Sequence, residues 1–367
     1  MPASDRSPAA TRNRVTIADI ARESGVSNAT VSLALRYRPG VGDETRRRIL
    51  DVARELGYPV SAPARPLMST MGVVIKTRPR DEPLSNLFYA PLVSGIEAFC
   101  RHSDINLVYA HLPVDEENNP LEPPRLMKEQ HADGLLIVGA QLNPGVVEIL
   151  HRLALPVVLV DAYAGTEPWD CVVTDNAAGA EVATEYLIAL GHHGIAMAGS
   201  RQESYPSIQE RRAGYLAAMS RHGLAPRFAD APHEAGAAAE AAVMLLRRHP
   251  ETTAVVAAND DVAIAVIGAA QAAGWRVPQD LSVIGFDNIS LAEHVRPALT
   301  TMRVDTVGMG RLGAQLLANR VRHPEAARVR AILRAELIER RSVQAVAEGN
   351  PSRRATSSPV ERMRDHD

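Results

Sequence analysis

The sequence predicts a small all-α head followed by an α/β body with parallel sheets. Three observations predict this fold class. Between residues 15 and 58, apolar residues recur at helical spacing in three short stretches. After residue 71, short apolar runs alternate with helical stretches, which is typical of βαβ units. Between these regions, residues 59–70 hold three prolines and are predicted to form a linker.

The composition excludes several classes of protein. The 367 residues, 46% apolar and 23% charged, are typical of a globular chain of two or three domains. No apolar run reaches the roughly 18 residues that a membrane span needs, and no apolar secretory signal is visible at the N-terminus. The two cysteines, Cys100 and Cys171, exclude a disulfide framework and a cysteine-based zinc site. We therefore expect a cytoplasmic protein with no membrane contact, metal or cofactor.

Charge is distributed unevenly along the chain, whose formal net charge is −3. Residues 1–70 contain 11 basic and 7 acidic side chains, whereas the remaining 297 residues contain 29 basic and 36 acidic ones. A basic head on an acidic body favours a head that meets a polyanion such as DNA. Chance fluctuation in an arginine-rich sequence explains the charge about equally well, so the pattern of residues has to decide.

The head helices follow from caps and turns. Thr16 and Ser27 are good N-caps for the first and second helices, and the turn between these helices contains Gly25. The third helix ends at Gly57, as helix C-termini prefer. Three short helices with a glycine turn between the first two are typical of a helix-turn-helix domain, which we place at residues 14–58.

The body is predicted to span residues 71–344. Strands are expected at Gly72–Ile75, Asn106–Ala110, Gly134–Val138, Val157–Val160, Cys171–Thr174, Ile195–Ala198, Ala254–Ala257 and Ser282–Phe286. Helices are expected at 90–102, 144–153, 177–190, 210–222, 237–248, 261–273 and 306–322. Because that many strands exceed one comfortable sheet, we expect two lobes, at about 71–160 with 304–330 and about 161–303 with 331–344. The polar ends, 1–13 and 345–367, are predicted to be disordered.

The second predicted helix carries the candidate base contacts. In a helix-turn-helix domain this helix enters the major groove, and its N-terminal residues reach base edges. The candidates are Ser27, Asn28, Ala29, Thr30, Ser32, Leu33 and, at the end, Arg36. Asn28 is suited to a bidentate contact with adenine. A purely structural cap of three helices is the alternative.

Hydroxyl side chains at helix starts are candidate phosphate contacts. Thr16, Ser27 and Thr45 stand where a hydroxyl and backbone N–H groups hold phosphate. The run Arg46–Arg48 opens the third helix and forms either a solvated face or a phosphate contact. We favour the solvated face for two of these three arginines.

The segment Val15–Tyr58 contains the motif TIADIA followed by GVSNATVS. It resembles the DNA-binding head of the LacI/GalR (lactose-repressor/galactose-repressor) family of bacterial transcription regulators. The body resembles the same family through FYAPLVSGIE from Phe88, ADGLLI from Ala132, ERRAGY from Glu210, ANDDVA from Ala258 and PALTTMRVD from Pro297. With the head, these segments cover about residues 15–340. The resemblance implies a two-lobed body similar to periplasmic binding proteins, which closes on a small effector. It also favours a homodimer, whose two heads read an operator arranged as an inverted repeat.

Two features depart from the family pattern. The family often has arginine where this chain has Leu33, which offers contact to a thymine methyl group instead of a bidentate contact to guanine. In the family a hinge helix forms on DNA and a leucine wedges into the minor groove, and Ala64 and Leu67 match that pattern. Pro66 would interrupt the bonding of such a helix. Leu67 is therefore either a wedge or an ordinary linker residue.

Polar residues at the predicted strand ends are candidate effector contacts. Asp161, Asn259 and Asp287 each end an apolar run, and Asp260 follows Asn259. Ligands of open α/β sheets bind at the carboxyl ends of strands, where carboxylates and amides are suited to hydrogen-bond a polyol. The alternative for each residue is a helix cap, and we assign Asp175, together with Asn176, to that role.

An aromatic pair and an arginine complete the predicted effector site. Phe88 and Tyr89 precede a helix and are suited to stack against a ring. The resemblance implies that Arg211 grips two effector oxygens and that Asp287 offsets its charge. We expect Arg211 at a helix start, where the helix dipole disfavours a cation. A surface ion pair is the alternative for Arg211.

The predicted function is sequence-specific binding of DNA by a transcription regulator, a repressor controlled by a sugar or sugar derivative. A solute-binding protein is an alternative, but the basic head argues against it. A sugar-metabolising enzyme is another, but the chain has no HExxH, GxSxG or P-loop pattern. His192 and His193 are expected to cap a helix at the surface rather than to bind metal.

Overall fold

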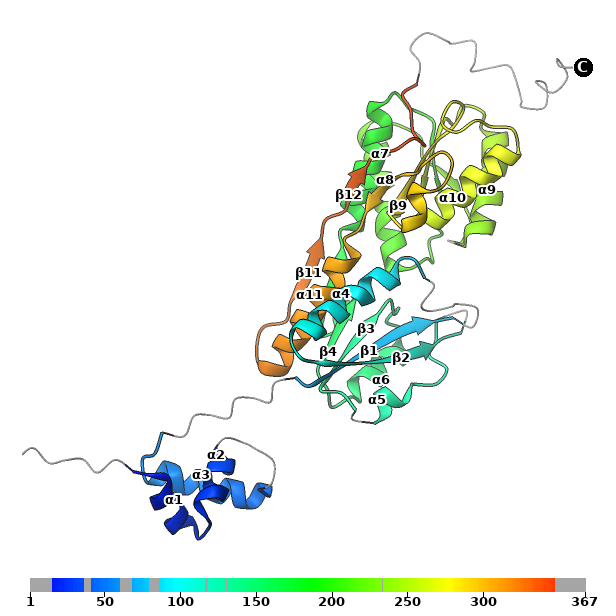
Figure 1. Ribbon diagram of the computed structural model, residues 1–367. Helices are drawn as coiled ribbons and strands as arrows, with labels where there is room; N and C mark the ends of the chain where they lie inside the picture. Colours follow the sequence, from blue (N-terminus) through cyan, green and yellow to red (C-terminus); the bar gives the residue numbers. More distant parts are fainter. Residues whose placement is uncertain are drawn as a thin grey trace, which may run out of the picture. The chain divides into compact units, whose positions relative to one another are not determined.

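The computed structural model of the 367-residue chain describes residues 15–35, 41–59, 68–78, 86–115, 118–129, 131–232 and 234–346. The chain divides into two compact units, a head within residues 1–67 and a body within residues 68–367 (Figure 1). The predicted tail at 1–13 and residues 347–367 of the predicted tail at 345–367 lie outside the described residues. The amide of Val346, by contrast, still donates to the carbonyl of Leu190.

The head consists of α1 (Ile17–Ser24), α2 (Asn28–Leu35) and α3 (Asp43–Glu55). A capping box starts α1, since Thr16 and Asp19 each satisfy a backbone N–H of the other. Gly25, at φ 68°, ends the helix in the left-handed conformation that glycine adopts without strain. The small core holds three helices together through Ile20, Val31, Ala34, Ile49 and Ala53, which are fully buried.

The first lobe of the body is built on a six-stranded parallel sheet in the order β11-β5-β4-β3-β1-β2. Its strands are β1 (Thr70–Thr77), β2 (Asn106–Pro113), β3 (Gly134–Val138), β4 (Val157–Val160), β5 (Asp170–Thr174) and β11 (Arg330–Leu333). The adjacent interior strands β3, β4 and β5 are buried along their whole length, which the continuous apolar runs of β3 and β4 predict.

The second lobe is built on a sheet in the order β12-β10-β9-β8-β6-β7. Its strands are β6 (Ile195–Ala198), β7 (Arg227–Ala229), β8 (Ala254–Ala257), β9 (Ser282–Asp287), β10 (Thr300–Arg303) and β12 (Glu336–Ile338). Neighbouring strands are parallel except for the pair β10 and β12. The fold class predicted from the sequence, a helical head with two parallel α/β lobes, is confirmed.

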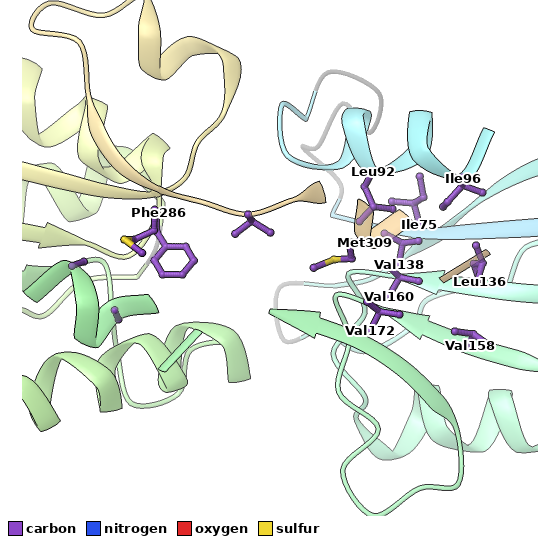
Figure 2. Packing of buried hydrophobic residues seen from close by; sticks show 14 of the residues in the cluster. Ile75, Leu92, Ile96, Leu136, Val138, Val158, Val160, Val172, Phe286 and Met309 are labelled. Atoms are coloured by element: carbon purple, nitrogen blue, oxygen red, sulfur yellow. The ribbon is translucent and has the colours of Figure 1, made fainter. Parts of the chain in front are cut away.

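Helices cover both sheets and pack closely on one another. They are α4 (Tyr89–His102), α5 (Arg125–Lys128), α6 (Pro144–His151), α7 (Asn176–Ala189), α8 (Pro206–Arg221), α9 (Ala235–Arg248), α10 (Asp260–Ala272), the 3-10 helix η1 (Ser290–Glu293) and α11 (Thr306–Arg322). A Cβ at Gly95 of α4 would collide with the carbonyl of Val307 in α11, so glycine allows these two helices to touch. In Figure 2, Leu92 and Met309 from this helix pair lie against Val138 and Val160 of the sheet.

The lobe boundaries differ from those expected. We expected the second lobe to begin near residue 161, but β5 pairs with β4 and extends the first sheet to Thr174. The first sheet also takes β11, beyond the expected limit of 330, by pairing β11 with β5. The chain then passes directly from β11 in the first sheet to β12 in the second, the orange-to-red strands in Figure 1. Strand order is set by long-range pairing, which the local apolar runs do not encode.

The linker is shorter than the expected 59–70, and its residues 60–67 lie outside the described residues. Met68 is buried, and Thr70 is the first residue of β1. The backbone amides of Ser69 and Thr70 donate to one carboxylate oxygen of Asp133, at 2.6 and 2.9 Å. Residues 68–70 therefore belong to the body. No helix among the described residues is long and apolar enough to cross a membrane.

Candidate functional site

The exposed face of α2 carries most of the predicted base contacts. Asn28 and Ala29 are exposed, and Leu33 is 37% exposed although it is apolar. Their neighbours Val31 and Ala34 are fully buried against α1 and α3. The helix therefore presents a row of small, polar and aliphatic side chains to solvent, as a surface that fits a DNA groove requires.

The hydroxyl groups of Thr16 and Ser27 cap α1 and α2. The hydroxyl of Ser27 accepts a hydrogen bond from the amide of Thr30 at 3.1 Å and lies 2.8 Å from the Thr30 hydroxyl. The hydroxyl of Thr16 donates to Asp19 at 2.7 Å. Ser32 and Thr45 are half-buried. The remaining predicted DNA contacts, Arg36, Ala64 and Leu67, lie outside the described residues.

Arg211 joins several elements at the carboxyl edge of the second sheet. Its Nε donates to Asn176 Oδ1 at 2.8 Å, Nη1 to the carbonyl of Ala258 at 2.6 Å, and Nη2 to Asp287 Oδ1 at 3.0 Å. The guanidinium stacks 3.8 Å from the ring centre of Phe286. Its side chain is 7% exposed, which excludes the alternative of a surface ion pair.

The position of Arg211 in its helix differs from the prediction. Proline at the first position starts α8 at Pro206, four residues before the expected 210. Arg211 therefore lies in the second turn, and the expected conflict with the helix dipole, which is confined to the first turn, does not arise. Its burial with Asp287 and Asn176 sets it apart from a solvated arginine.

The first lobe contributes Tyr89 and Asp161. The hydroxyl of Tyr89, at the start of α4, donates to Asp161 Oδ2 at 3.0 Å, directly after β4. The ring of Phe88 lies edge-on to that of Tyr89, with 5.2 Å between their centres. Asp161 and Asp287 both have positive φ, 51° and 113°, in a region that non-glycine residues seldom adopt. Such backbone strain concentrates at functional sites.

Comparison with known proteins adds to this geometry. Residues 16–60 match the family described as bacterial regulatory proteins of the lacI family, and residues 184–343 match the periplasmic binding protein-like domain. The chain is 31% identical over 341 residues to the HTH-type transcriptional repressor PurR of Photobacterium profundum, covering 90% of this chain and 98% of the relative. The chain belongs to the LacI family. It is a DNA-binding transcription regulator, and this family is not a family of enzymes.

Solved LacI-family structures share this architecture. A complex of the transcriptional regulator CelR with cellobiose is 28% identical, with a TM-score of 0.65, and covers 90% of this chain and 100% of that one. The lac repressor dimer bound to operator and the anti-inducer ONPF is 21% identical, with a TM-score of 0.64, and covers 91% of this chain and 100% of that one. The latter likeness concerns the fold alone.

In this LacI-family chain, burial changes the acid–base behaviour of the two site carboxyls. Removal from water raises the pKa of Asp161 to about 6, although Tyr89, Arg211 and Lys76 oppose the shift. Burial likewise raises the pKa of Asp287 to about 7, against the lowering effect of Arg211 and with a further raising effect from the charge of Asp161. Burial therefore moves the pKa values of both carboxyls toward neutral pH.

Two predicted effector residues have contacts that favour a supporting role. Asn259 caps α10 by accepting the amide of Val262 at 2.8 Å. Asp260 is fully buried, and its two oxygens accept from the Thr301 hydroxyl at 2.5 Å and the Ile289 amide at 2.8 Å. Burial raises the pKa of Asp260 to about 8. Its contacts brace β10 and the loop after β9 behind the Arg211 site.

Sequence reasoning missed the residues that hold Arg211 in place. We assigned Asp175 and Asn176 to helix capping, and Asp175 does accept the amide of Ala178 at 3.2 Å. Asn176 instead is buried, and its Nδ2 donates to the Tyr163 hydroxyl at 2.9 Å while its Oδ1 receives Arg211. The Tyr163 hydroxyl in turn donates to Glu210 at 2.6 Å. The only sequence signal for the role of Asn176 was that it is a polar residue directly after a predicted helix cap, and this signal is weak.

A second missed group, here called the lobe latch, joins the two lobes through Lys76, Arg78, Asn118, Tyr205 and Glu234. The Tyr205 hydroxyl, at the start of α8, accepts from Lys76 Nζ and from Arg78 Nη2, the latter at 3.0 Å, and donates to Asn118. Arg78 also pairs with Glu234 at 3.0 Å. Lys76, Arg78 and Asn118 come from the first lobe, whereas Tyr205 and Glu234 come from the second. Nothing in the sequence brings these residues together.

Proposed function

We propose that this regulator represses transcription from an inverted-repeat operator, and that a sugar or sugar derivative bound at the Arg211 site changes its operator affinity. The observation that carries the proposal is the set of buried Arg211 and half-buried Asp287, Asp161 and Tyr89. Tyr89 bonds Asp161 in the first lobe and Arg211 bonds Asp287 in the second, and the charges of the two pairs influence one another. Both aspartates stand at the carboxyl ends of strands, where open α/β sheets bind ligands.

The chemistry of these residues favours a polyhydroxylated effector. Three N–H groups of Arg211 donate to protein atoms in the described part of the chain, and its five-donor fork retains two for ligand oxygens. The carboxyls of Asp161 and Asp287 accept hydroxyl protons, and the half-buried rings of Phe88 and Tyr89 suit the apolar face of a pyranose. The cellobiose in the CelR complex, a relative 28% identical, supports a sugar.

The lobe latch provides the link from effector to operator. An effector shifts a conformational equilibrium only by binding one state more tightly than the other. Contacts from Tyr205 to Lys76 and Asn118 form only when the lobes are close, so an effector that contacts both lobes favours the latched state. We propose that this state changes the spacing of two heads in a homodimer.

The DNA-binding part of the proposal concerns α2. We propose that Asn28, Ala29 and Leu33 face base edges, with Ser27, Thr30 and Ser32 beside them, and that Thr16 and Thr45 face phosphates. A single α2 reads one half-site, and a homodimer reads two. The protein acts in the cytoplasm because its operator is there.

Selection and titration together test the proposal. Purified full-length protein selects duplexes from a random pool, and we expect an inverted repeat and a dimer in sedimentation. Operator affinity is then measured by gel shift with and without cellobiose, ribose and other sugars. A sugar that changes the operator Kd supports effector control. Selection of unrepeated sites, or an operator Kd that no sugar or nucleoside alters, contradicts the respective part of the proposal.

A further inference from the structure

The arginines that open α3 have different environments. Arg47 and Arg48 are exposed, whereas Arg46 is half-buried. Arg46 Nη1 donates to the carbonyls of Leu33 and Ala34, at 3.4 and 3.3 Å, and Nη2 donates to the carbonyl of Val41 at 3.2 Å. Arg46 therefore joins the end of α2 to the segment that leads into α3, and it is not a solvated side chain.

The end of α2 needs such a partner for two physical reasons. The last carbonyls of any helix lack intrahelical donors, and they form the negative end of its dipole. The last turn of α2 contains no basic residue of its own. The guanidinium of Arg46, from the neighbouring helix, donates to the carbonyls of Leu33 and Ala34 and places a compensating positive charge at this end of α2.

The contact also fixes the orientation of the last turn of α2, which the apolar core of the head does not fix. Val31 and Ala34 attach α2 to the core through non-directional burial of small side chains. The planar guanidinium of Arg46 accepts only a narrow range of positions for the three carbonyls that it bonds, since Nη1 donates to those of Leu33 and Ala34 and Nη2 to that of Val41. One of these carbonyls belongs to Leu33, whose side chain is exposed on the proposed base-contacting face.

We propose that Arg46 is a positioning residue for operator recognition. It holds the last turn of α2, and hence Leu33 and Ser32, at the depth and angle that the bases require, and it does so without touching DNA. The proposal rests on the proposed placement of α2 in the major groove. It is independent of the effector site, which lies in the other unit of the chain.

Salt dependence separates positioning from phosphate binding. The test compares full-length Arg46→Gln with Arg54→Gln, which removes the same charge from an exposed arginine of α3. Kd is measured for the selected operator and for an unrelated duplex across a salt series. We expect Arg46→Gln to lose at least about 10-fold more affinity for operator than for the unrelated duplex. The dependence of its Kd on salt concentration should equal that of Arg54→Gln.

Three results would overturn the proposal. Equal losses on both duplexes, with a salt slope lower by about 0.9 than that of Arg54→Gln, would make Arg46 a phosphate contact. Operator affinity equal to that of Arg54→Gln would make Arg46 dispensable. Arg46→Lys keeps the charge but not the fork, so operator binding by Arg46→Lys at the natural affinity would exclude a geometric role.

Two further measurements keep the test decisive. Loss of amide-exchange protection in α1–α3 would show that Arg46→Gln unfolds the head. In that case Arg46→Lys is compared with Arg54→Gln instead. If Arg46→Lys then discriminates between the two duplexes as well as the natural protein does, the proposal is contradicted. Leu33→Ala and Asn28→Ala distinguish failure of the underlying assumption. If neither variant weakens operator binding, α2 is not the reading helix. If both do while the Arg46 variants do not, only the positioning role is wrong.

Discussion

The head and the body differ in how far their charged side chains are exposed to solvent. In the head, the proposed contacts are exposed or half-buried, and the carboxyl of Asp19 has a lowered pKa, chiefly because Thr16 donates hydrogen bonds to it. In the body, Arg211 and Asn176 are buried and Asp287 is half-buried, and removal from water raises the pKa values of Asp161 and Asp287. The two units use the same residue types under different solvation.

The difference follows from the partner that each unit meets. A DNA backbone is large and charged, so exposed groups can bind it while both surfaces keep much of their water, and salt screens the interaction. A small neutral ligand offers only hydroxyl groups and ring faces, so its site must exclude water to discriminate. We therefore expect separable effects of substitutions in the head and strongly coupled effects in the body.

The largest effect is expected at Arg211. Arg211→Ala removes charge-assisted hydrogen bonds to the effector, each worth about 1.5–3 kcal/mol, so effector binding should weaken by at least about 100-fold. Operator affinity without effector should stay unchanged, because the head is a separate unit. Gel-shift titration of operator across effector concentrations measures both quantities.

Arg221→Ala is the matched control for Arg211. Arg221 lies on the same helix, but it is 57% exposed and pairs with Glu181 and Glu185 at the surface, where such pairs contribute little. Its variant should respond to effector like the natural protein. An Arg211→Ala variant that responds at the natural effector concentration would show that the buried cluster is purely structural.

A smaller effect is expected at Asn28 in the head. Asn28→Ala should cost about 1–3 kcal/mol at the selected operator and relax the base preference at one position. Affinity for an unrelated duplex should barely change, because no phosphate contact is lost. Competition binding with operators substituted at each position measures the preference. Equal losses of affinity on both duplexes would show that Asn28 contacts a phosphate. The distinction between residues that read bases and residues that bind phosphates would then not hold for Asn28.

The smallest effect, and the most direct test of the comparison, concerns pH. Carboxyls with raised folded pKa values, about 6 for Asp161, 7 for Asp287 and 8 for Asp260, stabilise the folded body fully below their unfolded pKa near 4. That contribution is lost as pH rises through about 6 to 8. The lowered pKa of Asp19 has the opposite effect, since its stabilisation of the head is present above pH 4 and lost in acid.

Hydrogen exchange on the full chain, corrected for intrinsic exchange rates, measures the two units separately. Between pH 5 and pH 8, we expect protection in the body to fall and protection in the head to stay level. Asp287→Asn should make the pH dependence of the body shallower. Protection that rises with pH in both units would contradict the expected difference in pH dependence between the head and the body.

Local patterns in the sequence were sufficient for the elements with buried, continuous apolar runs. The predicted strands β3, β4, β6 and β8 match the structure to the residue, and so does α11. Such runs are buried on both faces, so neighbouring elements change little about which residues they contain. Four short strands, β7, β10, β11 and β12, were not predicted. Of these, β11 and β12 are short, half-exposed strands at sheet edges, and their few apolar residues do not form the buried continuous runs that signal a strand.

The contacts of single polar residues depended on tertiary packing. We expected His192 at the surface, but it is 3% exposed, and its ring nitrogens bond Thr253 Oγ1 at 2.8 Å and the carbonyl of Gln344 at 3.0 Å. Family motifs indicated Arg211, whereas its partner Asn176 lies 35 residues away in sequence. Lys76 and Tyr205 of the lobe latch are 129 residues apart. Helical and strand periodicity describe neighbours within a few residues, while hydrogen-bond partners at this separation depend on which strands pair and how the two lobes meet.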